Sequence, residues 1–314
     1  MTGIAIPADP TALAAYEDVL RAAARDFADN AVSDNTERAY EAAWRSFTGF
    51  AAALGRSALP AEPQTVADYV AHLALLGRKA ATIRAYLTAI AVRHRAAGHE
   101  SPTEHGVVRS VTKGMRRALG VAPKKKDALL RDDLVAAVAA IPEDLRGLRD
   151  RALLLIGWAG AFRRSEIAAI DVDDLSFAHE GVVVTVRRAK TDQEAAGARV
   201  AIRRSQEPST CPVRALESWL AAADIESGPT FRAIDRYRHL GDRLSGRAVA
   251  EIIQVRAYGS NLGGHSLRAG FATSAARSGE TEATIMRHGR WRSIVVARGY
   301  IRSGSTWEDA PHLL

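Results

Sequence analysis

A proline followed by three lysines divides this sequence into two stretches of different character. The segment Ala122-Pro123-Lys124-Lys125-Lys126-Asp127 joins a residue that breaks helices to a block of like charge. Such a segment is typical of a solvated linker, although the same lysines would suit a path along a phosphate backbone. We therefore expect a helical domain over 1–121, a basic linker over 122–128 and a second domain over 129–314.

The first stretch has the apolar spacing of helices from residue 11 to about 119. A Ser33-Asp34-Asn35-Thr36 segment suits a helix start, and aromatic and apolar residues then recur at steps of three and four: Tyr40, Ala43, Trp44, Phe47 and Phe50. A basic helical run, VTKGMRRALG, lies near the end of the stretch. We interpret the aromatic residues as the core of a helical domain.

The second stretch predicts helices around one β-hairpin. We expect a helix from Asp132 to Ala140, an apolar helix from Leu148 to about Ile170, and further helices toward the end. Between them, GVVVTVRRAKTDQEAAGARVAI alternates as two strands, with Val182, Val184 and Val186 on one arm and Val200 and Ile202 on the other. The predicted fold class is mainly α, with a small antiparallel sheet in the second domain.

The overall charge favours a polyanionic partner. Lys and Arg number 43 against 36 Asp and Glu, which gives a net charge of +7 and a pI near 9.8.

The single cysteine, Cys211, excludes an intrachain disulfide and favours a reducing compartment. No segment approaches the roughly 18 uncharged apolar residues of a membrane span. We expect a cytoplasmic, nucleoid-associated protein with no membrane contact.

Four places in the second stretch set polar groups among apolar ones. In GAFRRSEIAAI, Arg163 and Glu166 are spaced to share one helix face, either as a structural ion pair or as part of a site. Arg164 points elsewhere and is the weaker candidate. Lys190 lies at the tip of the hairpin, where a lone lysine is usually a solvated side chain.

The third and fourth places lie near the C-terminal end. In GGHSLRAGFAT, His265 and Arg268 share a helix face near a helix start, where free N–H groups favour an anion. The stretch begins like a hydrolase elbow built on Ser266, but Arg268 replaces the second glycine, so a serine hydrolase is a remote alternative. In RHGRWRSIVVARGYIR, a short helix capped by Ser293 carries Tyr300.

In this order the four places resemble a known family. The order is Arg-x-Ser-Glu-Ile, a hairpin lysine, His-x-x-Arg, then Trp291 with Tyr300 nine residues later. This pattern resembles the tyrosine recombinases, the phage integrase family, and above all their Cre-like members, which carry Trp where many others have His. The segment NTERAYEAAWRSFTGFAAALGR is similar to that family's helical core-binding domain. His288 stands three residues before Trp291, at the wrong distance from Tyr300 to replace it.

The resemblance implies a site-specific recombinase that cuts and rejoins DNA through a 3′-phosphotyrosine, with no metal, ATP or other cofactor. The resemblance implies that Tyr300 is the nucleophile and that Arg163 and Arg268 clamp the scissile phosphate. It implies that His265 assists proton transfer and that Lys190 is the general acid. Trp291 would pack the site and donate its indole N–H, and Glu166 would support the arginines. Planar guanidiniums suit phosphate oxygens, whose charge grows in the transition state.

The resemblance also implies partners. These are double-stranded DNA with an inverted-repeat recombination site and a homotetramer on that DNA, in which the tail 305–314 docks into a neighbouring protomer or packs in cis. The candidate DNA-binding residues are Thr36, Arg38, Thr82, Arg84, Arg93, Arg95, Lys124, Lys125 and Arg247, the last being the best candidate for a guanine contact. Surface solubility is the alternative explanation for each arginine.

Two other functions share these features. One is a non-catalytic DNA-binding relative with an architectural or regulatory role, although such a protein has no need of Tyr300. The other is a type IB topoisomerase, which uses the same phosphotyrosine chemistry. The sequence leaves the target DNA sequence and the direction of recombination open.

Overall fold

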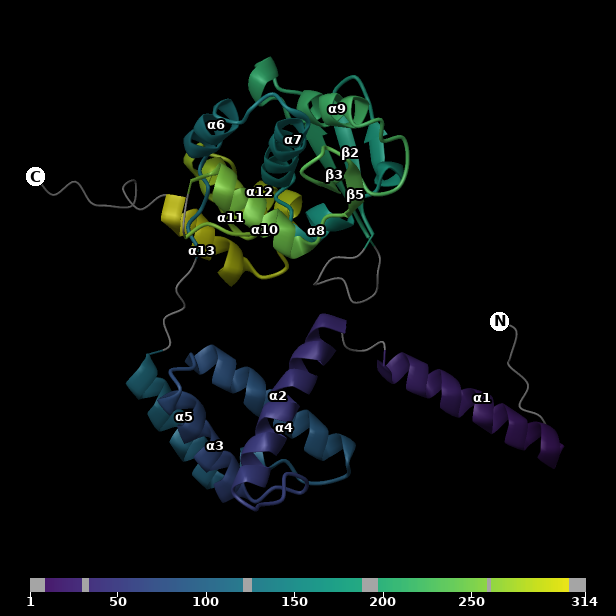
Figure 1. Ribbon diagram of the computed structural model, residues 1–314, viewed down its shortest axis with the longest axis vertical. Coiled ribbons are helices and arrows are strands. Elements are labelled where there is room, and N and C mark those ends of the chain that lie inside the picture. The colour runs from purple at the N-terminus through teal and green to yellow at the C-terminus, as the bar shows by residue number, and fades with distance from the viewer. Residues whose placement is uncertain (1–8, 30–33, 121–125, 188–196, 259–260, 305–314) are drawn as a thin grey trace, which may run out of the picture. The chain divides into compact units, whose positions relative to one another are not determined.

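The computed structural model describes residues 9–29, 34–120, 126–187, 197–258 and 261–304 of the 314-residue chain. The contacts within the chain divide it between Pro123 and Lys124 into two compact units. Both units are mainly helical, and the small antiparallel sheet lies in the second one (Figure 1), so the predicted fold class is confirmed. None of the described helices is long and apolar enough to cross a membrane.

The regular elements in the described part of the first unit are all helices. They are α1 (Pro10–Asp29), α2 (Asp34–Ala53), α3 (Pro63–Leu75), α4 (Ala80–Ala96) and α5 (Gly106–Leu119), with a short 3-10 helix at Pro102–Glu104. Phe47 and Tyr69 are buried at the centre with their rings 5.2 Å apart, and Trp44 and Phe50 pack against this core. The predicted aromatic core is therefore confirmed, and its burial is the main source of this unit's stability.

The core of the first unit also holds a polar side chain, His94, which is fully buried. Its Nε2 accepts a hydrogen bond from the Ala61 N–H at 3.0 Å, so its Nδ1 donates to the Ile90 carbonyl at 2.8 Å. Burial lowers the pKa of His94, and the neutral ring satisfies both bonds. This histidine is part of the core's architecture.

The second unit combines helices with short strands. In order it contains α6 (Arg131–Ala139), α7 (Leu145–Ala159), α8 (Arg164–Ala169), β1 (Leu175–Phe177), β2 (Gly181–Val186), β3 (Ala198–Arg203), α9 (Pro212–Ala222), β4 (Arg232–Ile234), β5 (Leu240–Arg243), α10 (Gly246–Arg256), α11 (Ser266–Arg277), α12 (Glu282–Gly289) and α13 (Ile294–Gly304), with 3-10 turns at Val172–Asp174 and Pro208–Thr210. The buried helix α7 packs against α9.

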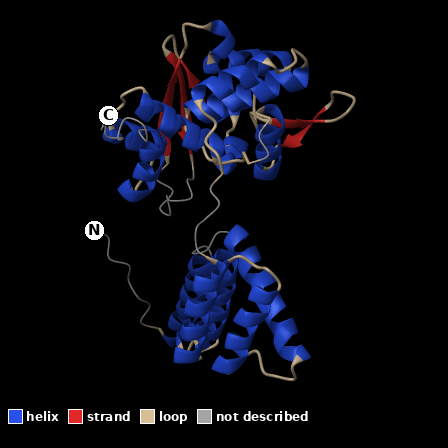
Figure 2. Cartoon of the chain, turned by 90° about the vertical axis from the view of Figure 1, so that its left-hand side faces the viewer, coloured by secondary structure: helices blue, strands red, loops and turns tan. Residues whose placement is uncertain are grey.

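The strands form two separate groups, which Figure 2 shows in red among the helices. Strands β1, β2 and β3 pair in that order, and Val182 lies opposite Ile202 while Val184 lies opposite Val200. All five predicted apolar positions of the hairpin are buried, which confirms its two arms. The β4–β5 pair is an addition that the sequence reading placed among helices.

The predicted helix from Leu148 to Ile170 is wrong, because the chain turns in its middle. Helix α7 ends at Ala159, Ala161 adopts a left-handed φ of 48°, Phe162 is fully buried, and α8 begins at Arg164. A continuous helix would commit the carbonyls of this stretch to bonds along its own axis. The break instead leaves the carbonyls of 159–161 for side chains from other helices.

Candidate active site

The guanidinium of Arg268 lies buried within a cluster of cationic, imidazole and aromatic side chains, and we call this cluster the pocket. Helix α11 carries this residue, which is 1% exposed. Its Nη1 donates to the Ala161 carbonyl at 2.7 Å, while its buried Nη2 has no hydrogen-bond partner in the described part of the chain. Burial, followed by the charge of Arg163, lowers its pKa to about 9, so the group stays cationic at neutral pH.

Glu166 supports this pocket from the start of α8. Its Oε1 accepts from Arg163 Nη1 at 2.6 Å, and its Oε2 accepts from the Arg163 N–H at 3.0 Å. Arg163 precedes the first turn of α8 in an extended conformation, so the two residues meet across a helix start and not on one helix face as predicted. Burial raises the pKa of Glu166, but Arg290 and Arg163 outweigh it and hold the pKa below its usual value.

Tyr300 on α13 reaches the same pocket. Its hydroxyl forms a short hydrogen bond with Nε2 of His265, and Thr273 Oγ1 on α11 donates to the Tyr300 carbonyl at 3.3 Å. Burial raises the pKa of Tyr300, and the charges of Arg268 and Arg163 oppose that rise. The phenol is therefore protonated at neutral pH and needs an acceptor for its proton.

His265 can provide that acceptor. The residue keeps an exposed edge, but desolvation of the ring, followed by the charges of Arg268 and Arg163, lowers its pKa below 6.5. The imidazole is therefore neutral at pH 7, with a free lone pair on one nitrogen. A neutral histidine against a tyrosine hydroxyl is a suitable arrangement for taking up the phenol proton.

Trp291 closes one side of the pocket. The guanidinium carbon of Arg268 lies 4.1 Å from its ring centroid, and the rings of Trp291 and Tyr300 are 5.9 Å apart. A Cβ atom on the preceding Gly289 would lie 1.6 Å from this indole, so the ring needs a glycine there. Trp291 thus packs both the central arginine and the tyrosine.

The structure brings six of the seven predicted active-site residues into one pocket: Arg163, Glu166, His265, Arg268, Trp291 and Tyr300. Lys190 lies outside the described residues. Arg164 is exposed. His288 donates to the Ala159 carbonyl at 2.7 Å and stacks on Phe271, which is a packing role.

Ser266 does not have the setting of a hydrolase nucleophile. The residue is 0% exposed, and its Oγ accepts a hydrogen bond from the Gly263 N–H at 2.9 Å. Such a hydroxyl holds the turn before α11 together.

Sequence reasoning missed Arg290 and the carbonyls of the α7–α8 turn. Arg290 donates to Glu166 Oε2 at 2.9 Å and also reaches the carbonyls of Gly160 and Ala161. The basic RHGRW segment was a signal for such a residue. The broken helix had no sequence signal as strong, since Gly160 alone is weak evidence for a helix end.

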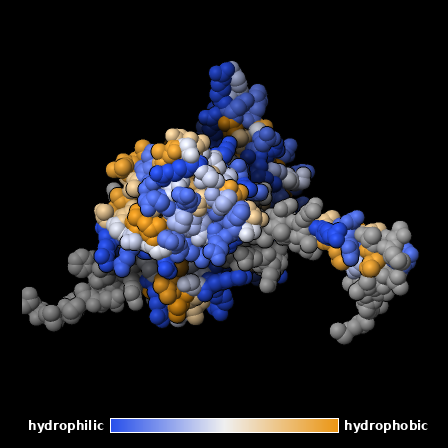
Figure 3. Space-filling model, turned by 90° about the horizontal axis from the view of Figure 1, so that it is seen from below, coloured by the Kyte–Doolittle hydropathy of each residue, from blue (hydrophilic) through white to orange (hydrophobic). Residues whose placement is uncertain are grey.

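The candidate DNA-binding residues lie mostly on exposed helix faces. Arg84 is exposed on α4, Arg93 pairs with Glu41, Arg95 pairs with Glu104, and Arg247 on α10 pairs with Glu251 at 2.8 Å. Thr36 and Arg38 lie on α2 and Thr82 lies on α4. Lys124 and Lys125 are outside the described residues. The surface visible in Figure 3 is mainly hydrophilic, with scattered hydrophobic side chains.

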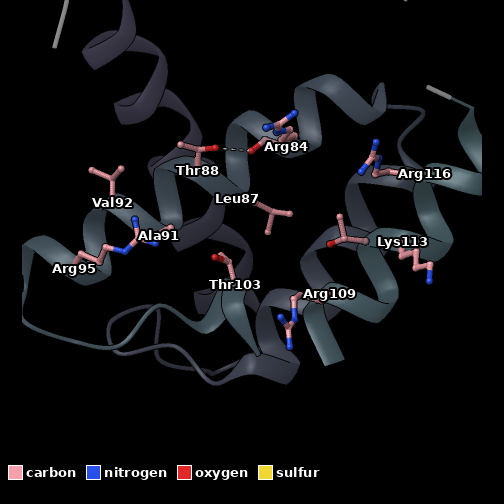
Figure 4. A pocket seen from close by; sticks show the side chains of 11 residues that line it. Arg84, Leu87, Thr88, Ala91, Val92, Arg95, Thr103, Arg109, Lys113 and Arg116 are labelled. Carbon is pink, nitrogen blue, oxygen red and sulfur yellow. Dashed lines mark hydrogen bonds between the residues drawn. The ribbon is translucent and has the colours of Figure 1, made fainter. Parts of the chain in front are cut away.

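A basic groove lies between α4 and α5 of the first unit. Its volume is about 620 Å³, and Figure 4 shows cationic side chains from both helices at its border: Arg84, Arg95, Arg109, Lys113 and Arg116. Sequence reasoning singled out the first two and missed the last three. Arg109 lies just before the VTKGMRRALG run, which contains Lys113 and Arg116, and the three follow an i, i+4 and i+7 spacing. Among the described residues, no group of three or more His, Cys, Asp or Glu is arranged to hold a metal ion.

The chemistry of the pocket indicates a class of protein. Buried guanidiniums around a tyrosine hydroxyl and a neutral histidine suit an enzyme that attacks a phosphate ester through a phenol.

Comparisons with known proteins agree with this class. The family model described as the phage integrase family matches residues 128–306. The chain is 38% identical over 287 residues to an integrase/recombinase XerD homolog of Selenomonas ruminantium, a match that covers 88% of this chain and 84% of the relative. It is also 26% identical over 298 residues to the recombinase Cre of Escherichia phage P1, covering 87% and 85% of the two chains.

Solved structures give the same fold. A lambda integrase dimer bound to a COC′ core site matches with a TM-score of 0.62 at 14% identity, over 95% of this chain and 80% of that one. This chain belongs to the phage integrase family, the tyrosine recombinases.

Proposed function

We propose that this protein is a site-specific DNA recombinase that cuts and rejoins strands through a covalent bond between Tyr300 and a 3′-phosphate. Membership of a family of strand-cutting enzymes supports the proposal. The observation that carries it is the contact of the Tyr300 hydroxyl with a neutral His265 beside the buried Arg268 guanidinium. Nucleophile, proton acceptor and cation are thus assembled within one unit.

The cleavage step follows from these groups. Tyr300 Oη attacks the phosphorus as its proton passes to Nε2 of His265, and the bond from phosphorus to the 5′-oxygen breaks. The departing oxygen takes a proton, for which Lys190 is the proposed donor. The new phosphotyrosine ester keeps the energy of the phosphodiester, so a 5′-hydroxyl can reverse the step without ATP.

The arginines stabilise the charge that develops on the phosphate. Arg268 is cationic at neutral pH, and its Nη2 has no partner among the residues that the structure describes. In this desolvated setting an anion is attracted more strongly than in water. Arg163, with a side chain that is 19% exposed, is the second cation. Trp291 fixes the plane of Arg268 and is the proposed indole donor to a phosphate oxygen.

The first unit is the proposed DNA-binding unit, with the groove between α4 and α5 as one region of phosphate contacts. Arg84, Arg109, Lys113 and Arg116 form no ion pair within the described residues, so their charges are free to meet phosphates. We further propose that the protein acts on inverted-repeat sites as a homotetramer, in association with the cell's DNA. The predicted docking tail, 305–314, lies outside the described residues.

Trapping the covalent intermediate tests the proposed function. The protein is incubated with nicked half-site DNA, which releases a short fragment after cleavage, and is then run on a denaturing gel. We expect a protein–DNA adduct with wild-type protein and none with Tyr300→Phe. A non-catalytic binder gives no adduct with either protein, which would refute the proposal.

Two further measurements complete the test. A type IB topoisomerase would relax supercoiled DNA lacking any specific site, whereas the proposed recombinase requires paired sites. For the tetramer, deletion of 305–314 should abolish synapsis of two sites, and normal synapsis of four protomers without this tail would contradict the proposed docking.

A further inference from the structure

Arg290, which contacts Glu166 of the pocket, has a backbone conformation that is unusual for an arginine. It follows α12 with a left-handed φ of 57°, a region that favours glycine and costs other residues about 1 kcal/mol or more. Its side chain is only 11% exposed. A strained backbone and a buried charge at one residue indicate that its side chain contributes something the fold cannot obtain from a glycine.

The contacts of Arg290 converge on Glu166 and on the α7–α8 turn. Nη2 donates to Glu166 Oε2 at 2.9 Å, and Nη1 donates to the Gly160 carbonyl at 3.2 Å. The guanidinium carbon also lies 5.0 Å from the ring centroid of Phe162, in the same turn. The side chain is therefore fixed from three directions, while its buried Nε has no partner in the described part of the chain.

Glu166 thereby holds two guanidiniums on separate oxygens. Arg163 occupies Oε1 and Arg290 occupies Oε2. If Arg290 were absent, the whole carboxylate charge would act on Arg163 and weaken its pull on any other anion. Its second oxygen would also lose its charged partner, so the carboxylate would be less fixed in orientation.

We propose that Arg290 is a positioning residue for strand cleavage: it orients and partly neutralises Glu166, so that Arg163 keeps its direction and its attraction for the scissile phosphate. This inference rests on the proposed function. Arg290 itself is not proposed to touch the DNA. Because the proposed effect of Arg290 on cleavage passes through Glu166, experiments can distinguish it from a purely structural role of Arg290 at the α7–α8 turn.

A double-mutant cycle provides the test. Single-turnover adduct formation on the nicked half-site, at saturating DNA, is compared for wild type, Arg290→Met, Glu166→Gln and the double variant. We expect Arg290→Met to slow the wild-type background about tenfold to a hundredfold, as loss of a supporting partner typically does. In the Glu166→Gln background the same change should alter the rate less than about threefold.

Arg290→Lys gives a second readout. Lysine keeps the positive charge opposite Glu166 without the planar fork, so it should recover at least half of the lost rate on a logarithmic scale. DNA affinity should change less than about threefold in every Arg290 variant, because the residue is not placed on the DNA. Melting temperatures are measured in parallel, and rates are compared where all variants are folded.

Arg256→Met serves as the matched control, because Arg256 also donates to a carboxylate that a second arginine holds, that of Asp150, at 2.7 Å. It should lower the melting temperature and leave the rate unchanged. The inference is overturned if Arg290→Met lowers stability alone, if its effect is equally large without the Glu166 charge, or if lysine restores stability but no rate. Absence of any adduct with wild-type protein would instead refute the proposed function.

Discussion

Two buried carboxylates in the second unit are each held by two arginines, yet only one of them belongs to the pocket. Asp150 accepts from Arg149 at 2.7 Å and from Arg256 at 2.7 Å. Glu166 accepts from Arg163 at 2.6 Å and from Arg290 at 2.9 Å. Their side chains are 4% and 2% exposed, so burial and pairing do not distinguish the two clusters.

The difference lies in what surrounds each pair. Arg149 also donates to the Arg232 carbonyl, which directs its charge into the fold. Next to Glu166, in contrast, stands Arg268, whose Nη2 has no partner within the described residues, and beyond it the Tyr300 hydroxyl. A buried ion pair is thus poor evidence of a functional site. A buried cation without a carboxylate partner of its own, next to a candidate nucleophile, is strong evidence of one.

The largest expected effect separates Arg268 from Arg149. Arg268→Ala should slow adduct formation at least about a hundredfold to a thousandfold, because it removes a preorganised charge from the transition state. Arg149→Ala should leave the rate per folded molecule unchanged while lowering the melting temperature. Single-turnover gels together with thermal unfolding measure both, and equal losses of rate would break the distinction between the clusters.

The next effect concerns stability. Asp150→Asn should reduce the free energy of unfolding by about 3 kcal/mol, because it leaves two arginines without their buried counter-charge. The exposed Asp173→Asn is the matched control and should stay within about 0.5 kcal/mol of wild type. Urea denaturation measures both variants. Equal stability of the two would show that the Asp150 cluster does not hold the fold.

A pH profile sharpens the comparison further. If the neutral His265 accepts the phenol proton as proposed, the cleavage rate should fall as the pH drops through the lowered pKa of His265, with a midpoint below 6.5. The free energy of unfolding should also fall on acidification. The unfolded chain binds a proton at His265 more readily than the folded chain does, so stability is lost as the pH falls from 6.5 through the lowered pKa. Asp150→Asn should keep the midpoint, and a rate that rises toward acid would contradict the role of His265.

The smallest effect is expected at an exposed ion pair, Arg247 with Glu251. Arg247→Ala should leave the melting temperature unchanged, because exposed pairs contribute little to stability. If Arg247 reads a guanine, the affinity for a cognate half-site should fall about fivefold to tenfold, with little change for unrelated DNA. Binding curves at one fixed salt concentration measure this, and an equal loss on all DNA would mark a phosphate contact instead.

The sequence predicted those parts of the fold that local spacing encodes. The aromatic residues of the first unit and the alternating valines of β2 are buried as expected, because periodicity and burial are directly linked. The order of the motifs resembles that of the tyrosine recombinases, and this resemblance also predicted the six described members of the pocket.

What the sequence did not predict depends on contacts between distant segments. Arg290 meets Glu166 across 124 positions, and the carbonyl of Ala161 meets Arg268 across 107. No local pattern encodes such pairs. The break between α7 and α8 was missed for the same reason, since its apolar residues continue a helical pattern while tertiary packing turns the backbone.

The turn between α7 and α8 affects which mutations the protein can tolerate. The anchor of Arg268 is a main-chain oxygen, which every amino acid supplies, so replacing the methyl group of Ala161 by hydrogen leaves the anchor intact. Adding or removing one residue there would swing the oxygen away altogether. The alignment of the Arg268 guanidinium therefore depends on the length of this connection, and at position 161 it depends on the backbone and not on the side-chain methyl group.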